Sequence, residues 1–221
     1  QPVTIVETFL NHVTCPGGSD GSVGIDVQNG TAPYTYRWSN GFTTEGLANV
    51  PAGTYLLIVT DANGCVGMRS FTITQPPAIV ITLASKQNPT CAGVNNGRID
   101  IEAAGGTPGY TYLWSNGATT QDITNAAAGP NIVTVRDSRG CAKDTTISLT
   151  APPAITITVV TVRQVTCFGT NTGLIDVTLA GGTGALAVQW LKDGAPFSTQ
   201  TDLLGIGAGQ YPITVTDANG C

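Results

Sequence analysis

The sequence has few charged residues, a single histidine, a single methionine and no long hydrophobic run. Charged residues make up 10% of its 221 residues, whereas ordinary globular chains contain about 25%. The nine Lys and Arg residues are spread thinly in a chain of net charge −5, which argues against nucleic-acid binding. Apolar runs such as residues 56–59 have the length of a strand, so we expect no membrane insertion in this segment.

Catalytic and metal-binding patterns are also missing. The sequence contains no Gly-x-Ser-x-Gly motif, no phosphate-binding loop and no Cys-x-x-Cys pair, and His12 is its only histidine. Zinc requires four clustered nitrogen or sulfur ligands, and a thiol nucleophile requires a nearby base. We therefore expect no enzyme activity, no metal site and no cofactor.

What the sequence does contain is an internal repeat with a period of 76 residues. Trp38, Trp114 and Trp190 are each 76 residues apart, within similar segments, and a fixed long period indicates one domain copied in tandem. We expect three repeats, which comprise residues 1–76, 77–152 and 153–221. Proline pairs at 76–77 and 152–153 mark the joints, because proline ends strands and stiffens connections.

Short strands are predicted throughout each repeat. In the first repeat, residues 21–27 and 34–38 alternate between the two faces of a strand, and residues 3–9, 53–60 and 66–74 are also strand-like. This pattern predicts an all-β protein of three tandem immunoglobulin-like β-sandwich repeats in an extended rod. The three tryptophans are expected to lie in the sandwich cores.

The third repeat differs from the others toward its end. Four extra residues fall between Trp190 and Cys221, around residues 192–196, and predict a longer hairpin. The sequence stops at Cys221, where the counterpart of strand 66–74 should begin. We expect this repeat to lack its last strand, either because the fragment is cut short or because a partner chain supplies the strand.

Every repeat contains two cysteines, which predict disulfides and an oxidising, extracellular compartment. Pairing within each repeat is the simplest interpretation, and each loop of about 50 residues would contribute roughly 4 kcal/mol in the chain-entropy model. The preferred pairs are Cys15–Cys65, Cys91–Cys141 and Cys167–Cys221.

Geometry leaves other arrangements of the cysteines open. The two cysteines of one repeat can lie at opposite ends of a strand of about 8 residues, which spans ~26 Å. A disulfide requires Cα atoms about 6 Å apart. Pairs between neighbouring repeats, Cys15–Cys141 and Cys91–Cys221, are then the alternative, and free thiols are a third possibility.

Several motifs of the second repeat together carry a family resemblance. They are Thr-Cys at 90–91, Gly-x-Ile-Asp at 97–100, Tyr-x-Tyr-x-Trp-Ser-Asn-Gly at 110–117 and an Asp-to-Cys turn at 137–141. This unit resembles the SprB repeat of Bacteroidetes cell-surface proteins. The chain departs from the SprB pattern at four positions. Asn131, Leu186 and Val188 stand where the family has tyrosine, and Gly24 stands where it has aspartate.

The resemblance implies a segment of a long, secreted adhesin exported by the type IX system. We expect a structural stalk on the bacterial cell surface that serves attachment or gliding motility. The expected partners are neighbouring repeats, copies of the chain in a filament, and surface glycans or a substratum. The alternative is a carbohydrate- or surface-binding module that acts through exposed loops, with residues 186–196 as its best candidate.

Three weaker signals concern ions and glycans. Asp20, Asp61, Asp137 and Asp217 lie beside Asn or Gly and could suggest calcium, but each repeat offers too few carboxylates, so turn capping is expected. Residues 29–31 match the N-glycosylation sequon, although we expect only a turn there. Residues 144–146 resemble the Bacteroidetes O-glycosylation pattern, which makes Thr145 a candidate glycan site.

Overall fold

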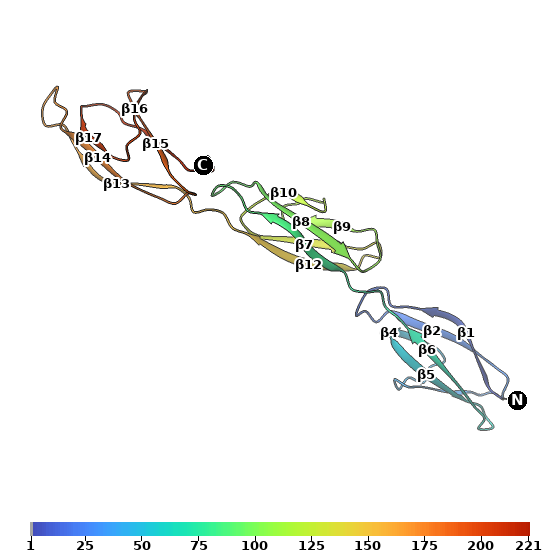
Figure 1. The fold of residues 1–221 in the computed structure, drawn as a ribbon. Coiled ribbons are helices and arrows are strands. Elements are labelled where there is room, and N and C mark those ends of the chain that lie inside the picture. The colour runs from blue at the N-terminus through green and yellow to red at the C-terminus, as the bar shows by residue number, and fades with distance from the viewer. Residues whose placement is uncertain (1) are drawn as a thin grey trace. The chain divides into compact units, whose positions relative to one another are not determined.

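The computed structural model describes residues 2–221, and these residues form strands and turns without a helix (Figure 1). The first repeat contains β1 (Thr4–Asn11), β2 (Gly21–Gln28), β3 (Thr35–Trp38), β4 (Leu47–Val50), β5 (Gly53–Thr60) and β6 (Val66–Ile73). The second contains β7 (Val80–Gln87), β8 (Gly97–Ala104), β9 (Thr111–Trp114), β10 (Ile123–Ala126), β11 (Gly129–Arg136) and β12 (Ala142–Leu149). The third contains β13 (Thr156–Arg163), β14 (Gly173–Ala180), β15 (Ala187–Lys192), β16 (Ala195–Ser198), β17 (Leu203–Ile206) and β18 (Ile213–Thr216).

Each repeat contains two three-stranded sheets. The first repeat has the orders β1-β2-β4 and β3-β5-β6, the second has β10-β8-β7 and β12-β11-β9, and the third has β13-β14-β17 and β16-β15-β18. In the first repeat all neighbouring strands run antiparallel. Strand β4 was not among the predicted strands, because its sequence Leu-Ala-Asn-Val buries only its two ends and does not alternate.

The core of the first repeat lies between its two sheets. Ile5, Val23 and Ile25 come from one sheet, and Leu57 and Phe71 come from the other, in one buried cluster. Strand β5 shows the period of two that places alternate side chains inside, because Tyr55, Leu57 and Val59 are buried while their neighbours are more exposed. The first repeat is therefore a β-sandwich.

The three tryptophans occupy equivalent buried positions. Trp38, Trp114 and Trp190 are 1%, 2% and 2% exposed. Each indole N–H donates to a loop carbonyl, that of Thr44, Thr120 or Gln200, at 2.9 Å. The polar edge of each buried ring is thus satisfied while its apolar faces pack.

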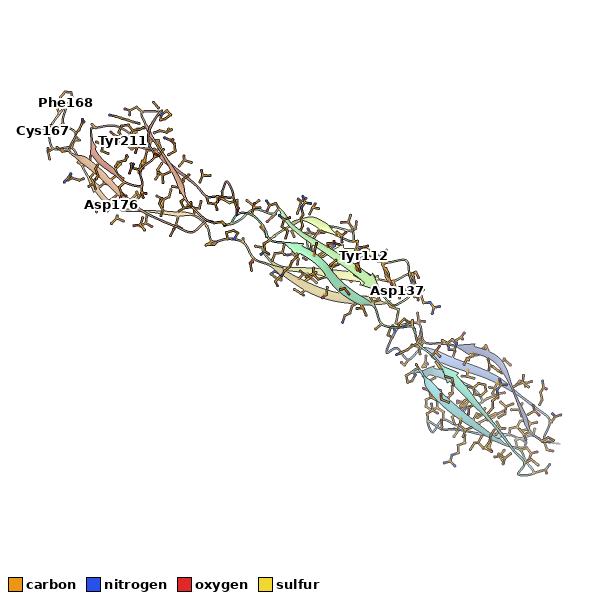
Figure 2. All side chains as sticks on the ribbon, viewed as in Figure 1. Tyr112, Asp137, Cys167, Phe168, Asp176 and Tyr211 are labelled. Carbon is orange, nitrogen blue, oxygen red and sulfur yellow. A yellow bond between two sulfur atoms is a disulfide. The ribbon has the colours of Figure 1, made fainter. Side chains whose placement is uncertain are left out.

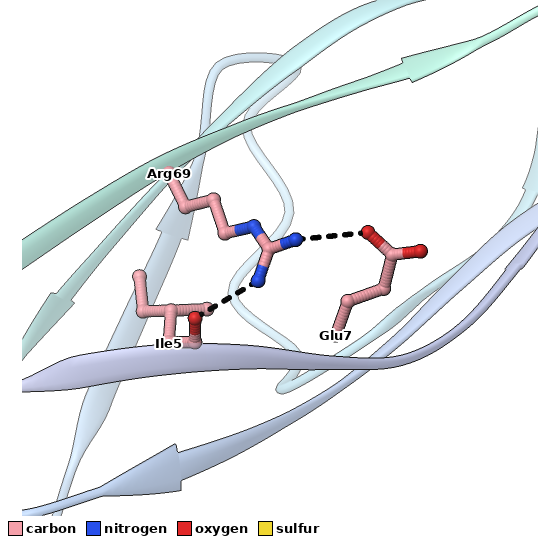
Figure 3. A network of polar contacts seen from close by, with 3 residues as sticks. All are labelled: Ile5, Glu7 and Arg69. Carbon is pink, nitrogen blue, oxygen red and sulfur yellow. Dashed lines mark hydrogen bonds and ion pairs between the residues drawn. The ribbon is translucent and has the colours of Figure 1, made fainter.

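An arginine links the two sheets of the first repeat (Figure 3). Arg69 of β6 donates to the carbonyl of Ile5 and to the carboxylate of Glu7, both at 3.1 Å and both on β1. Its guanidinium also lies 5.0 Å from the centre of the Phe71 ring. Because β1 and β6 belong to different sheets, these contacts fasten one edge of the sandwich.

A departure from the repeat motif is compensated locally. The hydroxyls of Tyr55 and Tyr211 donate to loop carbonyls four residues earlier, on Pro51 and Gly207. Asn131 stands at the corresponding position of the second repeat, is 5% exposed, and donates from Nδ2 to the carbonyl of Ala127, also four residues earlier. Asparagine therefore keeps the hydrogen bond that tyrosine makes in the other repeats.

The third repeat has its own core and the predicted longer hairpin. Val177, Trp190 and Leu203 lie in one buried cluster. Strands β15 and β16 pair antiparallel across the inserted residues, which confirms the hairpin. Among its described residues, β18 pairs with β15 alone. The described part of the third repeat therefore contains no counterpart of β6 or β12.

The fold class expected from the sequence is confirmed: the chain is an all-β protein of tandem immunoglobulin-like repeats. By its contacts the chain forms two compact units. One contains the described residues up to Thr82, with Glu102–Leu113 and Val133–Thr145, and the other contains Leu83–Ile101, Trp114–Ile132 and Thr146–Cys221. The repeat boundaries at 76/77 and 152/153 stay predictions. Within residues 2–221, no helix has the length and apolarity that crossing a membrane requires.

Two adjacent leucines of β5 test the sandwich core. Leu57 is 0% exposed and Leu56 is 37% exposed. We predict that Leu57→Ala lowers the free energy of unfolding by about 2–5 kcal/mol, because it leaves a cavity between the sheets. Leu56→Ala, the matched control, should change it by about 0.5 kcal/mol or less. Chemical denaturation measures both, and equal losses would contradict the assignment of inner and outer faces.

Candidate functional site

The disulfides join successive repeats. Cys15 pairs with Cys141, with Cα atoms 5.5 Å apart, and Cys91 pairs with Cys221, with Cα atoms 5.7 Å apart. Cys65 and Cys167 are unpaired and exposed. This corrects the preferred pairs Cys15–Cys65, Cys91–Cys141 and Cys167–Cys221, and it corresponds to the alternative pairing between repeats.

The length of one strand explains why a repeat does not close on itself. Cys15 precedes the eight-residue strand β2, and Thr31, just beyond that strand, donates its N–H to Asp61 beside Cys65. In the third repeat, Cys167 precedes β14 in the same way, and Thr183 beyond that strand contacts the turn of Cys221. A strand of this length spans ~26 Å, so the two cysteines of one repeat cannot approach to bonding distance.

One buried aspartate organises the turn before each second cysteine. Asp61, Asp137 and Asp217 are 5–6% exposed. Each carboxylate accepts three backbone N–H groups, two from its own turn and one from the loop after β2, β8 or β14. The donors are Thr31, Asn63 and Cys65 to Asp61, Thr107, Arg139 and Cys141 to Asp137, and Thr183, Asn219 and Cys221 to Asp217, at 2.8–3.0 Å.

These hydrogen bonds lower the pKa of all three carboxyl groups. The N–H of Thr107 has the largest effect on the pKa of Asp137, and the N–H groups of Cys141 and Arg139 lower it further, while burial acts in the opposite direction. For Asp61 and Asp217 the first cause of the lowered pKa is the N–H of the following cysteine. The repeated aspartates therefore act as turn caps, and their oxygens are engaged by the backbone.

The incoming cysteine contacts the backbone of the loop that receives it. The Sγ of Cys141 lies 3.4 Å from the carbonyl oxygen of Thr14, and the Sγ of Cys221 lies 3.4 Å from that of Thr90. Asn219 donates from Nδ2 to the same Thr90 oxygen at 3.0 Å. Each joint thus consists of a Thr-Cys loop from one repeat and an Asp-anchored turn from the next.

An apolar groove lies on the first repeat. It encloses about 720 Å³ and is lined by β1, β2 and the segment 41–48, including Phe9, Gly24, Phe42 and Glu45. Phe9 and Phe42 are about half exposed. The Phe9 ring lies directly over Gly24, because a Cβ built there would be 2.2 Å from a ring carbon. The volume is within the range of small-molecule sites.

This groove depends on residues that the sequence analysis did not select. Phe9 and Phe42 have Ser85 and Ala118 as their counterparts in the second repeat, and Gly24 has Asp100. Glycine at position 24, where the family has aspartate, was the feature of the sequence that could have indicated the groove. It lacks the side chain that would occupy the place of the Phe9 ring. The spacing of the two phenylalanines follows neither a strand nor a turn pattern, so their proximity comes from the fold.

The segment 186–196, expected as the best binding loop, forms mostly the β15–β16 hairpin. Beside it, the rings of Phe197 and Tyr211 lie 5.5 Å apart in an edge-to-face arrangement. The ammonium of Lys192 is 5.9 Å from one ring centre and 5.8 Å from the other. This cluster holds the hairpin through aromatic and cation–π contacts.

The remaining candidate residues lie apart from the joints and the groove. Thr145 is half-buried on β12, and its modification stays a prediction. Asn29 has a positive φ of 63° in the turn after β2, and its Nδ2 donates to Thr4 Oγ1. Within residues 2–221, no cluster of three or more His, Cys, Asp or Glu side chains has the arrangement of a metal site.

One known family model matches a segment of each expected repeat. The family model described as the SprB repeat matches residues 10–43, 83–119 and 158–185, one segment in each expected repeat. The three segments are similar to the SprB repeat. The matched segments contain the three Thr-Cys pairs at 14–15, 90–91 and 166–167, of which the first two lie in joints. No curated protein matches the chain.

Solved structures align with most of the chain, but they superimpose on it poorly. Three N-terminal domains of the Hoc capsid protein of bacteriophage RB49 align over 92% of this chain and 78% of that chain, with 16% identity and a TM-score of 0.39. Domains 4–9 of the surface layer protein SbsC align over 100% and 44%, with 14% identity and a TM-score of 0.30. Immunoglobulin domains 1–5 of Sidekick-1 align over 100% and 57%, with 11% identity and a TM-score of 0.32. Because of these low TM-scores, the likenesses carry no functional information.

Acid titration tests the role of the buried aspartates. The pKa of Asp137 lies below its ordinary value of 3.8 in the folded chain. As the pH falls, the carboxyl group of Asp137 therefore binds a proton more readily in the unfolded chain than in the folded chain. The stability from Asp137 is therefore complete above pH 3.8 and is lost as the pH falls through the lowered pKa. We predict that Asp137→Asn lowers stability at neutral pH and flattens the acid limb of the stability curve.

Denaturant midpoints measured across this pH range check the prediction for Asp137. Asp144→Asn is the matched control, because Asp144 is exposed on β12. The control should retain both the neutral stability and the acid limb. An unchanged acid limb in Asp137→Asn would show that this carboxylate does not hold the turn.

Proposed function

We propose that this chain is a structural segment of a bacterial cell-surface adhesin or filament, serving as a stalk in attachment or gliding motility. The disulfides and the SprB repeats indicate an extracellular protein. The observation that carries the structural role is the covalent link between successive repeats. Its proposed partners are neighbouring repeats, further copies of the chain, and a surface or substratum, and no catalytic step is involved.

The disulfides bear on how such a segment would respond to tension. The Cys15–Cys141 bond connects two cysteines that are 126 residues apart in the sequence. A pulling force therefore passes through the bond and bypasses most of the residues between them. The Cys91–Cys221 bond provides a second shortcut across a separation of 130 residues. The oxidised chain therefore resists extension even after its sheets open, which suits a segment that transmits load.

Single-molecule stretching tests this load-bearing role. We predict that reducing both disulfides lengthens the fully stretched chain about threefold, because the extended length follows the number of residues in the load path. The double variant Cys15→Ser/Cys91→Ser should show the longer extension without reductant. Equal extension of the oxidised and reduced chains would contradict the proposed role of the bonds.

A carbohydrate-binding role is the second candidate, and the groove of the first repeat favours it. Exposed Phe9 and Phe42 rings offer apolar faces, and Thr43, Thr44 and Glu45 place polar groups on the lining. An apolar wall with a few polar groups is the usual composition of a ligand site. The proposed location is thus the first repeat, whereas residues 186–196 were expected.

Titration of the chain with a panel of soluble oligosaccharides, followed by NMR, tests the groove. A bound sugar should shift resonances of residues 41–48. We predict that Phe42→Ala weakens binding about tenfold, through loss of buried apolar contact. Met68→Ala, at an exposed apolar site on β6 outside the groove, should bind the sugar as tightly as the parent chain. Resonance shifts at residues outside the groove would exclude the groove as the sugar-binding site. Sugar binding by Phe42→Ala as tight as that of the parent chain would also exclude it.

A further inference from the structure

Two cysteines, Cys65 and Cys167, are halves of joints whose partner is not among residues 2–221. Cys65 occupies the place that Cys141 and Cys221 occupy in their Asp-anchored turns, and Cys167 occupies the place of Cys15 and Cys91 in the Thr-Cys loops. Both are exposed, whereas Cys141 in its joint is 5% exposed. Within the part of the chain that the structure describes, the turn of Cys65 and the loop of Cys167 are therefore unoccupied.

The unoccupied loop has the geometry of the occupied ones. In all three loops the residue before the cysteine donates its N–H to the side chain six residues later, at 3.0–3.1 Å. The pairs are Thr14 with Asp20, Thr90 with Asn96 and Thr166 with Thr172. The glycine two residues after each cysteine has a φ of +76°, +74° or +77°, at Gly17, Gly93 and Gly169 respectively. The Cys167 loop thus has its receiving shape without a bound partner.

The unoccupied turn is formed equally well. The carboxylate of Asp61 accepts the N–H of Cys65 at 2.8 Å, as Asp137 and Asp217 do for their cysteines at 2.9 Å. Gly64, Gly140 and Gly220 have φ values of +82°, +84° and +81°. Hence the turn that carries Cys65 has the same backbone as the two turns that enter a joint.

An apolar side chain next to Cys167 supplies a second indication of a missing partner. Phe168 is fully exposed, and Figure 2 shows it with Cys167 on a loop beyond the strands of the third repeat. Its counterpart Ala92 lines a cavity of about 140 Å³ in the joint of Cys91, together with Pro152, Pro153, Ile155 and Cys221. A phenylalanine at this position would meet the corresponding surface of an incoming repeat.

We propose that the Cys167 loop receives the Cys65 turn of a second copy of this chain and forms a disulfide with it. Both thiols lose a proton and the pair loses two electrons, which a disulfide oxidant such as oxidised glutathione accepts. The Cys167 thiolate displaces one glutathione thiolate, and the Cys65 thiolate of the second copy then displaces the other. This link is independent of the adhesive role, because it depends on joint geometry alone.

Two single-thiol variants test the link in the full chain. Cys65→Ser retains Cys167, and Cys167→Ser retains Cys65, with both native disulfides intact. We expect an equimolar mixture under oxidised glutathione to give mainly mixed dimers, above the proportion that random pairing gives. Non-reducing electrophoresis of isotope-labelled chains measures that proportion, and peptide mapping should find Cys65 joined to Cys167. The parent chain should form a ladder of head-to-tail multimers.

Four outcomes would overturn the proposal. They are mixed and like dimers in the random proportion, glutathione adducts without dimers, monomers that retain both thiols, and an internal Cys65–Cys167 bond in the parent chain. The double variant Cys65→Ser/Cys167→Ser should stay monomeric throughout. Its denaturation profile should match that of the parent, since both substituted side chains are exposed.

Discussion

Both joints in this chain, and the unpaired turn of Cys65, depend on one buried carboxylate that accepts three backbone N–H groups. Asp61, Asp137 and Asp217 each tie a tight turn to the loop that follows the strand β2, β8 or β14. This contact fixes the position of the next cysteine relative to the sandwich. Because an unpaired buried carboxylate would be costly, the three hydrogen bonds and the turn stabilise each other.

The disulfides follow from this arrangement. The aspartate holds one cysteine of a repeat at the far end of an eight-residue strand from the other, so the sulfur atoms of one repeat face different neighbours. Pairing between repeats satisfies the geometry that a bond within the repeat cannot. Among residues 2–221, the turn of Cys65 and the loop of Cys167 stay unpaired.

Much of the fold could be predicted from local patterns. Strands β2 and β5 alternate clearly, and the turns around Gly64 and Gly140 are marked by their residues, so their positions were close to those expected. Strand β4 was missed because it is short and does not alternate. The groove was missed because Phe9 and Phe42 are brought together only when β1 and the segment 41–48 pack beside Gly24.

By itself, the sequence determined the 76-residue repeat, the β-sandwich class and the burial of the tryptophans, because periodicity and alternation are local properties of the chain. Only the tertiary structure decided which cysteines meet. Their pairing depends on the length of a strand and on which of its ends each turn is held against, and sequence spacing does not contain that information. For this reason the equal spacing of the cysteines suggested closure within a repeat, whereas the structure joins each repeat to the next.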